Sequence, residues 1–478
     1  MSEPIQLSND RWYPQFHITA PSGWINDPNG LSFFKGRYHA FFQHHPYSAT
    51  WGPMHWGHVS STDLISWQHE PIALAPGEPG EDDTDGVWSG SAVVHDDTLY
   101  AFYTGNRWVN SVDDSEGKYQ TQMLATSTDG IHFTKHGAVV PPVAADARDP
   151  KVFWVKDRWY MTIGASIDDR GHVRFYSSPD LLNWTEEGSL FEDPDSTVFM
   201  IECPDFFPLG DKWVLLYGPM VNKPVRSGYA LRNGHNAGYV VGSWTPGEKF
   251  VPETSYRPLD WGHHFYATQS MEAPDGRRIA FGWMGEFANP LGSQADGWSG
   301  QLAIPRELTL DDDLTLVSTP ARELSALFAS PTTHNRSLGA NKGFEVSDIP
   351  AAKLSVKVDL DKDVPLQVPT CEQVVLSFTR GSSSATKLMF DTLARRVHLV
   401  HGDHNDAGRG YRSAPWTPGE DLTIYLDKGS IEAFIGEGRE TLSSLDFEGE
   451  GNRTLSVETV NGPADVTVHI AALTPERD

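Results

Sequence analysis

The sequence contains very little cysteine: two residues, Cys203 and Cys371, in a chain of 478. Two cysteines cannot build the disulfide framework that stabilises small secreted domains. The chain also lacks an apolar run of membrane-spanning length. Its first residues, MSEPIQLSNDRWYP, show no basic stretch followed by an apolar core. From these absences we expect a cytoplasmic protein that has no membrane partner.

Basic residues are scarce relative to acidic ones. The chain has 37 Lys and Arg against 64 Asp and Glu, which gives a formal net charge of −27. A protein with this charge is repelled by nucleic acid and by anionic membrane surfaces, so we expect neither as a partner. The length favours two domains, or a repeat architecture with an extra domain. A homo-oligomer stays open, because nothing in the composition fixes the oligomeric state.

Long amphipathic helix patterns are rare, and short alternating runs between Gly, Asp and Asn dominate, which is typical of β-structure. Two motifs repeat along the first two thirds of the chain. One is a Ser-x-Asp turn before an aromatic residue, and the other is a polar turn that enters an aromatic-rich strand. The turns lie at 61–67, 127–133 and 178–184, and the strands at 35–43, 97–105, 157–165, 211–219 and 276–284. Five such copies predict a five-bladed β-propeller.

Four polar motifs occupy one position of this repeat. Each lies eleven residues before the aromatic residue that opens its strand. Tyr38 leads to Asp27, Tyr100 to Ser89, Tyr160 to Asp149 and Trp213 to Glu202, and the less regular fifth copy has HFYATQS at 264–270. The first strand of each propeller blade lines the central axis, so equivalent positions converge there. We therefore expect the three carboxylates to meet in one funnel rather than to lie on separate surface loops.

The sequence pattern changes after about residue 315. The segment STPARELSALFAS at 318–330 carries apolar residues at helical spacing and predicts a short linker helix. Regularly spaced strand patterns follow it, as in an antiparallel β-sandwich. We therefore predict an all-β protein with a five-bladed β-propeller over residues 1–317, a linker with a short helix over 318–335 and a C-terminal β-sandwich over 336–478.

Three carboxylates in one funnel indicate glycoside hydrolysis. This reaction needs one carboxylic acid to protonate the leaving oxygen and a second carboxylate to attack the sugar or to activate water. Asp27 lies in a turn whose N–H donors would keep it ionised, as suits a nucleophile. Glu202 follows an apolar run that would raise its pKa, as suits a general acid. Asp149 follows Arg148, and we expect this paired, ionised group to stabilise charge.

Several motifs resemble those of glycoside hydrolase family 32, which contains invertases and related β-fructofuranosidases. They are WINDPNG at 24–30, FFQHHP at 41–46, WSGSAV at 88–93, RDPKVF at 148–153, ECPDFF at 202–207 and DKGSIEAFIGEGRETLSS at 427–444. The resemblance covers the whole chain and implies a five-bladed propeller with a C-terminal β-sandwich. In one departure, Trp88 stands where the family often has Phe, so we expect a changed pocket wall and unchanged chemistry.

The resemblance implies that Asp27 is the nucleophile, Glu202 the acid/base and Asp149 the transition-state stabiliser. It also implies retaining hydrolysis of terminal β-D-fructofuranosyl residues from sucrose or fructo-oligosaccharides, without a cofactor. The residues that it implies for binding the substrate are Asn26, Gln43, Trp51, Trp88, Ser89, Arg148 and Cys203.

Other functions stay open at this point. A related five-bladed propeller could hydrolyse another furanoside such as an arabinan, and sucrose 6-phosphate is an alternative substrate. A non-catalytic propeller that serves as an interaction platform would give no reason for three acids at one repeat position. We expect the loops 106–120 and 221–237 to form the walls that select the leaving group.

A loose group of histidines raises the question of a metal site. The residues are His44, His45, His55 and His58, and their spacing matches no standard zinc pattern. We therefore expect no metal, and we expect these histidines to lie on loops and to bond to hydroxyl or backbone groups.

Overall fold

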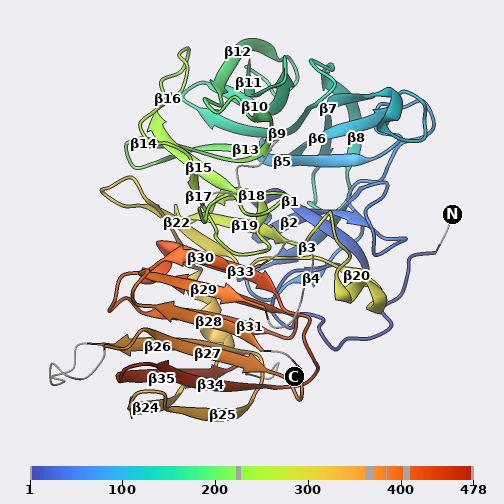
Figure 1. The fold of residues 1–478 in the computed structure, drawn as a ribbon. Coiled ribbons are helices and arrows are strands. Elements are labelled where there is room, and N and C mark those ends of the chain that lie inside the picture. Colours follow the sequence, from blue (N-terminus) through green and yellow to red (C-terminus); the bar gives the residue numbers. More distant parts are fainter. Residues whose placement is uncertain (1–2, 222–227, 361–369, 384, 402–409, 475–478) are drawn as a thin grey trace.

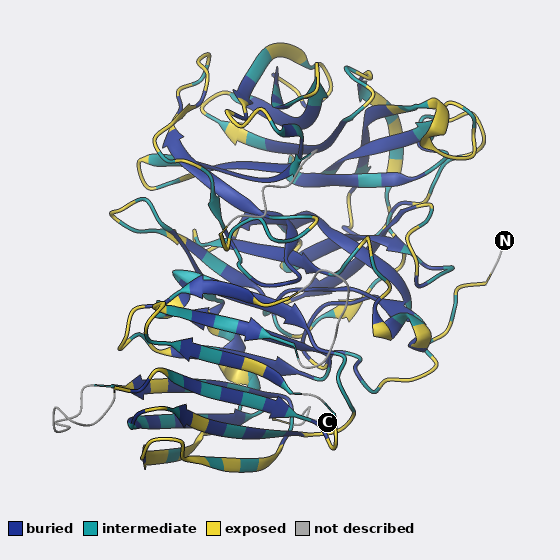
Figure 2. Ribbon diagram, in the orientation of Figure 1, coloured by how far each residue is buried: buried dark blue, intermediate teal, exposed yellow. Residues whose placement is uncertain are grey.

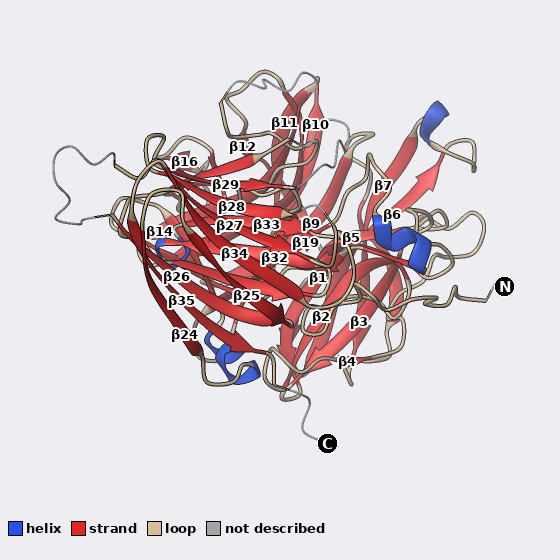
Figure 3. Ribbon diagram, turned by 60° about the horizontal axis from the view of Figure 1, so that its bottom comes forward, coloured by secondary structure: helices blue, strands red, loops and turns tan. Residues whose placement is uncertain are grey.

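A computed structural model describes residues 3–221, 228–360, 370–383, 385–401 and 410–474. Strands make up nearly all of the regular structure, as Figure 3 shows. Within the described residues, helix is limited to four 3₁₀ segments: η1 (Asp114–Glu116), η2 (Gly292–Asp296), η3 (Arg322–Leu327) and η4 (Gly436–Gly438). None of the helices in these ranges has the length and apolar character needed to cross a bilayer.

The N-terminal part is a β-propeller, as predicted. Its described residues form five sheets, and the first strands β1, β5, β9, β13 and β18 contact one another in ring order, with β18 touching β1 (Figure 1). Strand β20 pairs in parallel with β1, so a late segment of the propeller closes the ring.

The strands of the five propeller sheets have the following bounds. The first sheet contains β1 (Gly23–Phe34), β2 (Arg37–His45), β3 (His55–Ser61), β4 (Gln68–His69) and β20 (Trp298–Ser299). The second contains β5 (Val87–His95), β6 (Thr98–Trp108), β7 (Lys118–Ser127) and β8 (Thr134–Val140), and the third β9 (Ala147–Val155), β10 (Arg158–Ile167), β11 (Arg170–Ser178) and β12 (Thr185–Glu192). The fourth contains β13 (Val198–Leu209), β14 (Lys212–Val221), β15 (Gly238–Ser243), β16 (Val251–Pro252) and β17 (Arg257–Pro258). The fifth contains β18 (Tyr266–Glu272), β19 (Arg278–Met284), β21 (Gln301–Leu302), β22 (Arg306–Leu310) and β23 (Leu316–Pro320).

The two sequence repeats correspond to turns and strands of the blades. The aromatic-rich repeats are the second strands β2, β6, β10, β14 and β19. In the first blade, Lys35 and Gly36 form the turn before β2 with φ angles of 49° and 79°, which suits the twist of a tight hairpin. The Ser-x-Asp repeats lie between the third and fourth strands of the first three blades. In the first of them, the Asp63 carboxylate accepts the backbone N–H groups of Ile65 and Ser66.

The C-terminal part is a β-sandwich, and its described residues form two six-stranded sheets. One sheet has the order β24 (Thr332–Leu338), β35 (Ala464–Ala472), β26 (Ala352–Asp359), β31 (Leu422–Asp427), β32 (Ser430–Ile435) and β33 (Glu440–Leu445). The other has the order β25 (Gly343–Ile349), β34 (Arg453–Val460), β27 (Gln373–Thr379), β28 (Thr386–Asp391), β29 (Arg396–Val400) and β30 (Arg412–Pro415). Buried and exposed residues alternate along many of these strands, and the buried sets meet in one apolar core (Figure 2).

The segment between the two parts differs in detail from the prediction. The expected linker helix is the short 3₁₀ segment η3, in which only Leu324 is buried. Strand β23 still pairs with β22 up to Pro320, and β24 begins at Thr332. The predicted boundaries at 317 and 335 therefore fall inside these two strands.

A fully buried network of charged side chains connects the propeller to the sandwich. Arg306 of β22 donates to Asp260, at 3.2 Å, and to Glu432 of the sandwich, at 2.6 Å. His17 lies 2.7 Å from Asp427 and 2.9 Å from the same Glu432. Buried charges are tolerated only when they are paired and hydrogen-bonded, so this network holds the two parts in one arrangement.

Candidate active site

Each of the five inner strands of the propeller contains a β-bulge, and the five bulges lie at equivalent positions along their strands. The register shifts fall between Ile25 and Pro28 in β1, between Trp88 and Gly90 in β5, and opposite Thr162 and Gly164 in β9. The bulges in β13 and β18 lie at 202–205 and 266–269. The tetrads that surround the bulges are Asn26-Asp27-Pro28-Asn29, Trp88-Ser89-Gly90-Ser91, Arg148-Asp149-Pro150-Lys151, Glu202-Cys203-Pro204-Asp205 and Tyr266-Ala267-Thr268-Gln269. A bulge re-aims the side chains of a strand, and here it lets consecutive residues contribute to one pocket.

This alignment corrects the predicted repeat register in the fourth blade. Lys212 pairs with Leu209 across the hairpin as Arg158 pairs with Val155, so Trp213 corresponds to Trp159 and not to Tyr160. The residue equivalent to Asp149 is therefore Cys203. Glu202 precedes it, at the position that Arg148 holds in the third blade.

The bulges place three non-glycine residues in the left-handed backbone region. The φ angles are 66° at Asp149, 49° at Cys203 and 51° at Ala267. Such conformations are strained and persist only where their surroundings hold them. Two hydrogen bonds fix the bulge of the third blade: Asp149 N donates to Thr104 Oγ1 at 3.0 Å, and Cys203 N donates to Asp149 Oδ2 at 2.9 Å.

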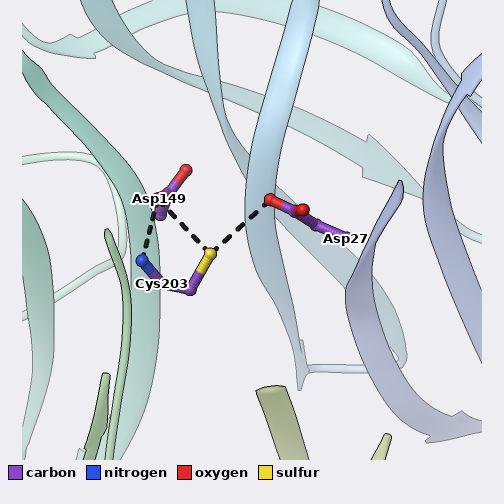
Figure 4. Close-up of side chains that lie close together, drawn as sticks. All are labelled: Asp27, Asp149 and Cys203. Atoms are coloured by element: carbon purple, nitrogen blue, oxygen red, sulfur yellow. Dashed lines mark hydrogen bonds between the residues drawn. The ribbon is translucent and has the colours of Figure 1, made fainter. Parts of the chain in front are cut away.

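Asp27, Asp149 and Cys203 converge from three strands, as Figure 4 shows. The Cys203 Sγ atom lies 3.5 Å from a carboxylate oxygen of Asp27 and 3.5 Å from one of Asp149. Ligand atoms of the three side chains lie within 4.8 Å of one another. Asp27 also accepts hydrogen bonds from Ser89 Oγ at 2.7 Å and Asn26 Nδ2 at 3.0 Å, which fix both of its oxygens.

Glu202 is held from two sides. The Arg148 guanidinium donates through Nη2 at 2.7 Å and through Nε at 3.1 Å to Glu202 Oε1. The Tyr266 hydroxyl donates to Glu202 Oε2. Arg148 also donates to Asp146 at 2.7 Å, so it binds two carboxylates at once. These contacts fix the orientation of the Glu202 carboxylate in the pocket.

The pKa values of the two aspartates are raised, contrary to the prediction that both are readily ionised. Burial raises the pKa of Asp27, although the hydrogen bond from Ser89 opposes this effect. Burial also raises the pKa of Asp149, where the opposing charge of Arg148 is offset in part by the carboxylates of Glu202 and Asp27. The two groups resist ionisation because several negative charges would otherwise share one dry site.

The pKa of Glu202 is lowered, contrary to the prediction that its surroundings raise it. Burial is the largest single influence and would raise the pKa, but the charges of Arg148 and His235 together with the hydrogen bonds from Tyr266 and Arg148 outweigh it. Arg148 was expected to pair with its neighbour Asp149. It reaches Glu202 of the neighbouring strand β13 instead, with Nη2 2.7 Å from Oε1.

A cavity of about 540 Å³ opens above these carboxylates. Its lining includes every predicted site residue except Cys203, which is buried beneath it: Asn26, Asp27, Gln43, Trp51, Trp88, Ser89, Arg148, Asp149 and Glu202. The lining residues that were not expected are Met54, Met220, Tyr266 and Phe287, and the others come from the two loops that were expected to form the outer walls: Trp108, Val112, Asp113, Asp114, Lys118 and His235. Tyr266 could have been found from the fifth repeat motif, HFYATQS, whose bulge places it level with Glu202.

Aromatic side chains surround the mouth of the cavity. Trp51 is 42% exposed and packs edge-on against Trp88, which packs in the same way against Trp108. Phe287 is 38% exposed and lies 4.9 Å from His235, measured between ring centroids. Exposed aromatic faces beside a polar floor suit the apolar C–H faces of sugar rings.

The two loops that were expected to form the outer walls contribute to the lining. The loop 106–120 provides Trp108, Val112, Asp113, Asp114 and Lys118, and the loop 221–237 provides His235. Residues 222–227 of the second loop lie outside the described residues.

The grouped histidines lie on strands and not on loops, which corrects that part of the prediction. His44 of β2 bonds to the Trp24 carbonyl at 2.9 Å, and His58 of β3 contacts His39 at 3.0 Å. Burial lowers the pKa of His44 to about 4 and that of His58 to about 3, so both are neutral near pH 7.

Comparison with known proteins shows that most of the chain matches carbohydrate-active proteins. The family model described as "Glycosyl hydrolases family 32 N-terminal domain" matches residues 17–320, and the corresponding C-terminal model matches residues 323–474. A sucrose-6-phosphate hydrolase of Zymomonas mobilis is 40% identical over 449 residues, which cover 90% of this chain and 85% of the relative. A raffinose invertase of Escherichia coli is 39% identical over 463 residues, which cover 95% of this chain and 94% of the relative. The solved structure of a β-fructofuranosidase variant of Bombyx mori in complex with sucrose superimposes with a TM-score of 0.84 at 34% identity, covering 97% of this chain and 94% of that one.

Proposed function

Because the chain belongs to glycosyl hydrolase family 32, we propose that it is a β-fructosidase in which Asp27, Asp149 and Glu202 carry out a retaining reaction on sucrose and short fructo-oligosaccharides. The observation that supports these roles best is the convergence of the three carboxylates in one aromatic-rimmed cavity. Each carboxylate has a different set of partners, which suits three different tasks.

Asp27 suits the nucleophile because its oxygens are fixed beneath the cavity by Ser89 and Asn26. In the first step, an oxygen of Asp27 bonds to C2 of the fructosyl unit while the bond from C2 to the glycosidic oxygen breaks. Glu202 gives its proton to that leaving oxygen. In the second step, water loses a proton to Glu202 and bonds to C2, and Asp27 leaves as a carboxylate.

The raised pKa of Asp149 and the lowered pKa of Glu202 bear on how the acid receives its proton. Three carboxylates and one guanidinium share the site, so the cluster tends to retain a proton. In the arrangement described here, that proton favours Asp149, while Arg148 keeps Glu202 ionised. Substrate hydroxyl groups that compete for Arg148 and Asp149 would move the proton to Glu202, and Asp149 would then stabilise the developing positive charge.

The charge at the mouth favours an uncharged leaving group over a phosphorylated one. Among the described residues that line the cavity, the Lys and Arg side chains are Lys118 and Arg148, and both already pair with Asp146. On the same wall are Asp113 and Asp114. Hydrogen bonds from Ser115 and Asn110 lower the pKa of Asp113 to about 2, so it is ionised at neutral pH and would repel a phosphate.

Steady-state kinetics with the purified protein test these proposals. We expect release of fructose from sucrose and 1-kestose, with a higher kcat/KM for sucrose than for sucrose 6-phosphate. Raffinose and inulin extend the series to larger substrates, and arabinan serves as the control for another furanoside. Release of arabinose without release of fructose would overturn the proposed activity, and a preference for sucrose 6-phosphate would overturn the proposed leaving group.

A further inference from the structure

A second polar layer lies directly beneath the catalytic carboxylates. It consists of the last residue of each bulge tetrad: Asn29, Ser91, Lys151, Asp205 and Gln269. All five are buried, with exposed fractions between 0% and 7%. Burying five polar side chains in a propeller core is costly unless each has partners, and the reaction proposed above uses none of them. This layer therefore requires its own explanation.

Lys151 and Asp205 connect three blades within this layer. Lys151 Nζ of β9 lies 3.2 Å from Asp205 Oδ1 of β13. The same ammonium donates to Gln269 Oε1 at 3.2 Å and to the Ser270 carbonyl at 2.5 Å, both on β18. Asp205 Oδ2 accepts both the backbone N–H and the hydroxyl of Ser270 at 2.6 Å. Arg278 of β19 completes the group at 3.5 Å from Asp205.

The two members of this ion pair immediately follow the strained parts of their strands. Lys151 is two residues beyond Asp149, and Asp205 is two residues beyond Cys203, and both of these preceding residues have left-handed φ angles. Since only a proline separates each pair, a shift of Lys151 or Asp205 would be passed directly to the bulge. The bond from Cys203 N to Asp149 Oδ2 and the contact between Arg148 and Glu202 both span the same two strands.

We propose that Lys151 and Asp205 are positioning residues for the reaction: their ion pair fixes the bulge of the third blade against that of the fourth and so sets the placement of Asp149 relative to Glu202. This inference rests on the proposed function, because it assigns a role within that same reaction. Misplacing a catalytic group by about 1 Å can lower the rate on the order of 100-fold, so loss of a supporting ion pair should lower kcat measurably.

The variant Lys151→Met tests the proposal through the separation of kcat from KM on sucrose. We expect kcat to fall about 10- to 100-fold while KM changes less than about 3-fold, because the aromatic mouth is untouched. Lys151→Arg, which keeps a charge able to reach Asp205, should recover most of kcat. The double variant with Lys151→Met and Asp205→Asn removes both members of the ion pair and should keep the low kcat, whereas a return of kcat to the wild-type value would contradict the positioning role.

A matched control comes from a buried ion pair of the sandwich. Arg453 lies 3.1 Å from Asp446, and their side chains are 3% and 4% exposed. The variant Arg453→Met should lower thermal stability in the same way as Lys151→Met but leave kcat within about 2-fold of wild type. Equal losses of kcat in the two variants would show a general effect of instability and would overturn the positioning role.

The structure also offers a chemical rescue. A separate cavity of about 270 Å³ is lined by Lys151, Ser270 and Arg278 together with residues such as Phe33 and Trp159, and it shares no lining residue with the substrate cavity. In Lys151→Ala, ethylammonium chloride should raise kcat in a saturable way, while sodium chloride at equal ionic strength should not. Absence of this rescue, or wild-type kcat in Lys151→Met, would overturn the proposal. A wild-type protein that releases no fructose would instead refute the proposed function.

Discussion

The buried histidine between the two parts of the molecule should make stability depend on pH. His17 lies between Asp427 and Glu432, and its side chain is fully buried. Burial alone would lower its pKa, but hydrogen bonds and the charges of the two carboxylates outweigh this and raise the pKa to about 9. The ordinary value is about 6.5. The folded state therefore binds the proton more tightly than the unfolded state, and the protonated pair stabilises the fold below that pH.

The sign and size of the effect follow from linkage. A group whose folded pKa is raised contributes fully below its unfolded pKa and loses its contribution as pH rises through the folded value. With values of about 6.5 and about 9, His17 contributes about 3 kcal/mol at pH 5 and at pH 7, and less than about 1 kcal/mol at pH 9. The free energy of unfolding should therefore fall by about 2 kcal/mol between pH 7 and pH 9 because of this residue.

The measurement is urea unfolding followed by tryptophan fluorescence at pH 7, 8 and 9, for wild type and His17→Gln. The variant will be less stable at every pH because it loses two buried hydrogen bonds. The informative quantity is therefore how the free energy of unfolding changes with pH in each protein, and the difference between these two slopes. Other titrating groups are common to both proteins and cancel. His58→Gln is the matched control, since burial lowers the pKa of His58 to about 3 and keeps it neutral over this range. Parallel slopes for wild type and His17→Gln would refute a protonated His17 in the folded protein.

Three further predictions concern the reaction. Asp27→Ala should abolish turnover of every substrate, whereas Glu202→Ala should spare an aryl fructoside with a good leaving group more than sucrose, and equal losses on the two substrates would contradict the acid role. The kcat/KM for sucrose should fall as the pH rises, because the cluster that contains Asp149 loses its proton, and kcat/KM for the aryl fructoside should fall less over the same pH range. Identical pH profiles for the two substrates would contradict proton donation by the cluster. Replacing Asp113 and Asp114 with Asn should raise the ratio of kcat/KM for sucrose 6-phosphate to that for sucrose by about 2- to 10-fold, because two exposed charges are removed, and an unchanged ratio would place the phosphate elsewhere.

Much of the fold could be predicted from the sequence because turns and strands repeat locally. The Ser-x-Asp motifs are side-chain-capped turns, and their effect depends on neighbours only two or three residues away, as at Asp63. The same is true of the polar hairpins that precede the second strands. The predicted positions of the polar motifs along the inner strands were close to correct, since the length of a hairpin sets the register of its strands. The one-residue error at Glu202 arose because two aromatic residues, Trp159 and Tyr160, stand side by side in the third blade.

The electrostatics of the site could not be read from sequence neighbours. Arg148 adjoins Asp149 in the chain, yet its guanidinium reaches Glu202 on another strand. The ionisation of each carboxylate depends on which charges face it across the funnel, and this is a property of the assembled ring. Tyr266 escaped assignment for a related reason, because its tetrad carries no acidic residue and its hairpin is less regular than those of the other blades. Its contribution to the site became visible only when the bulges were aligned.

The fifth blade shows what the bulge itself provides. Ala267 has no chemistry to offer, yet it adopts the same left-handed backbone as Asp149 and Cys203. Such a conformation costs on the order of 1–3 kcal/mol in a non-glycine residue, so catalysis alone does not account for it there. The bulge is therefore a property of the inner strands that the blades maintain against strain. Because the same left-handed backbone recurs in three neighbouring blades, the chemistry depends on which side chain occupies it: a carboxylate at Asp149, a thiol at Cys203 and a methyl group at Ala267, next in sequence to Tyr266, whose hydroxyl binds Glu202.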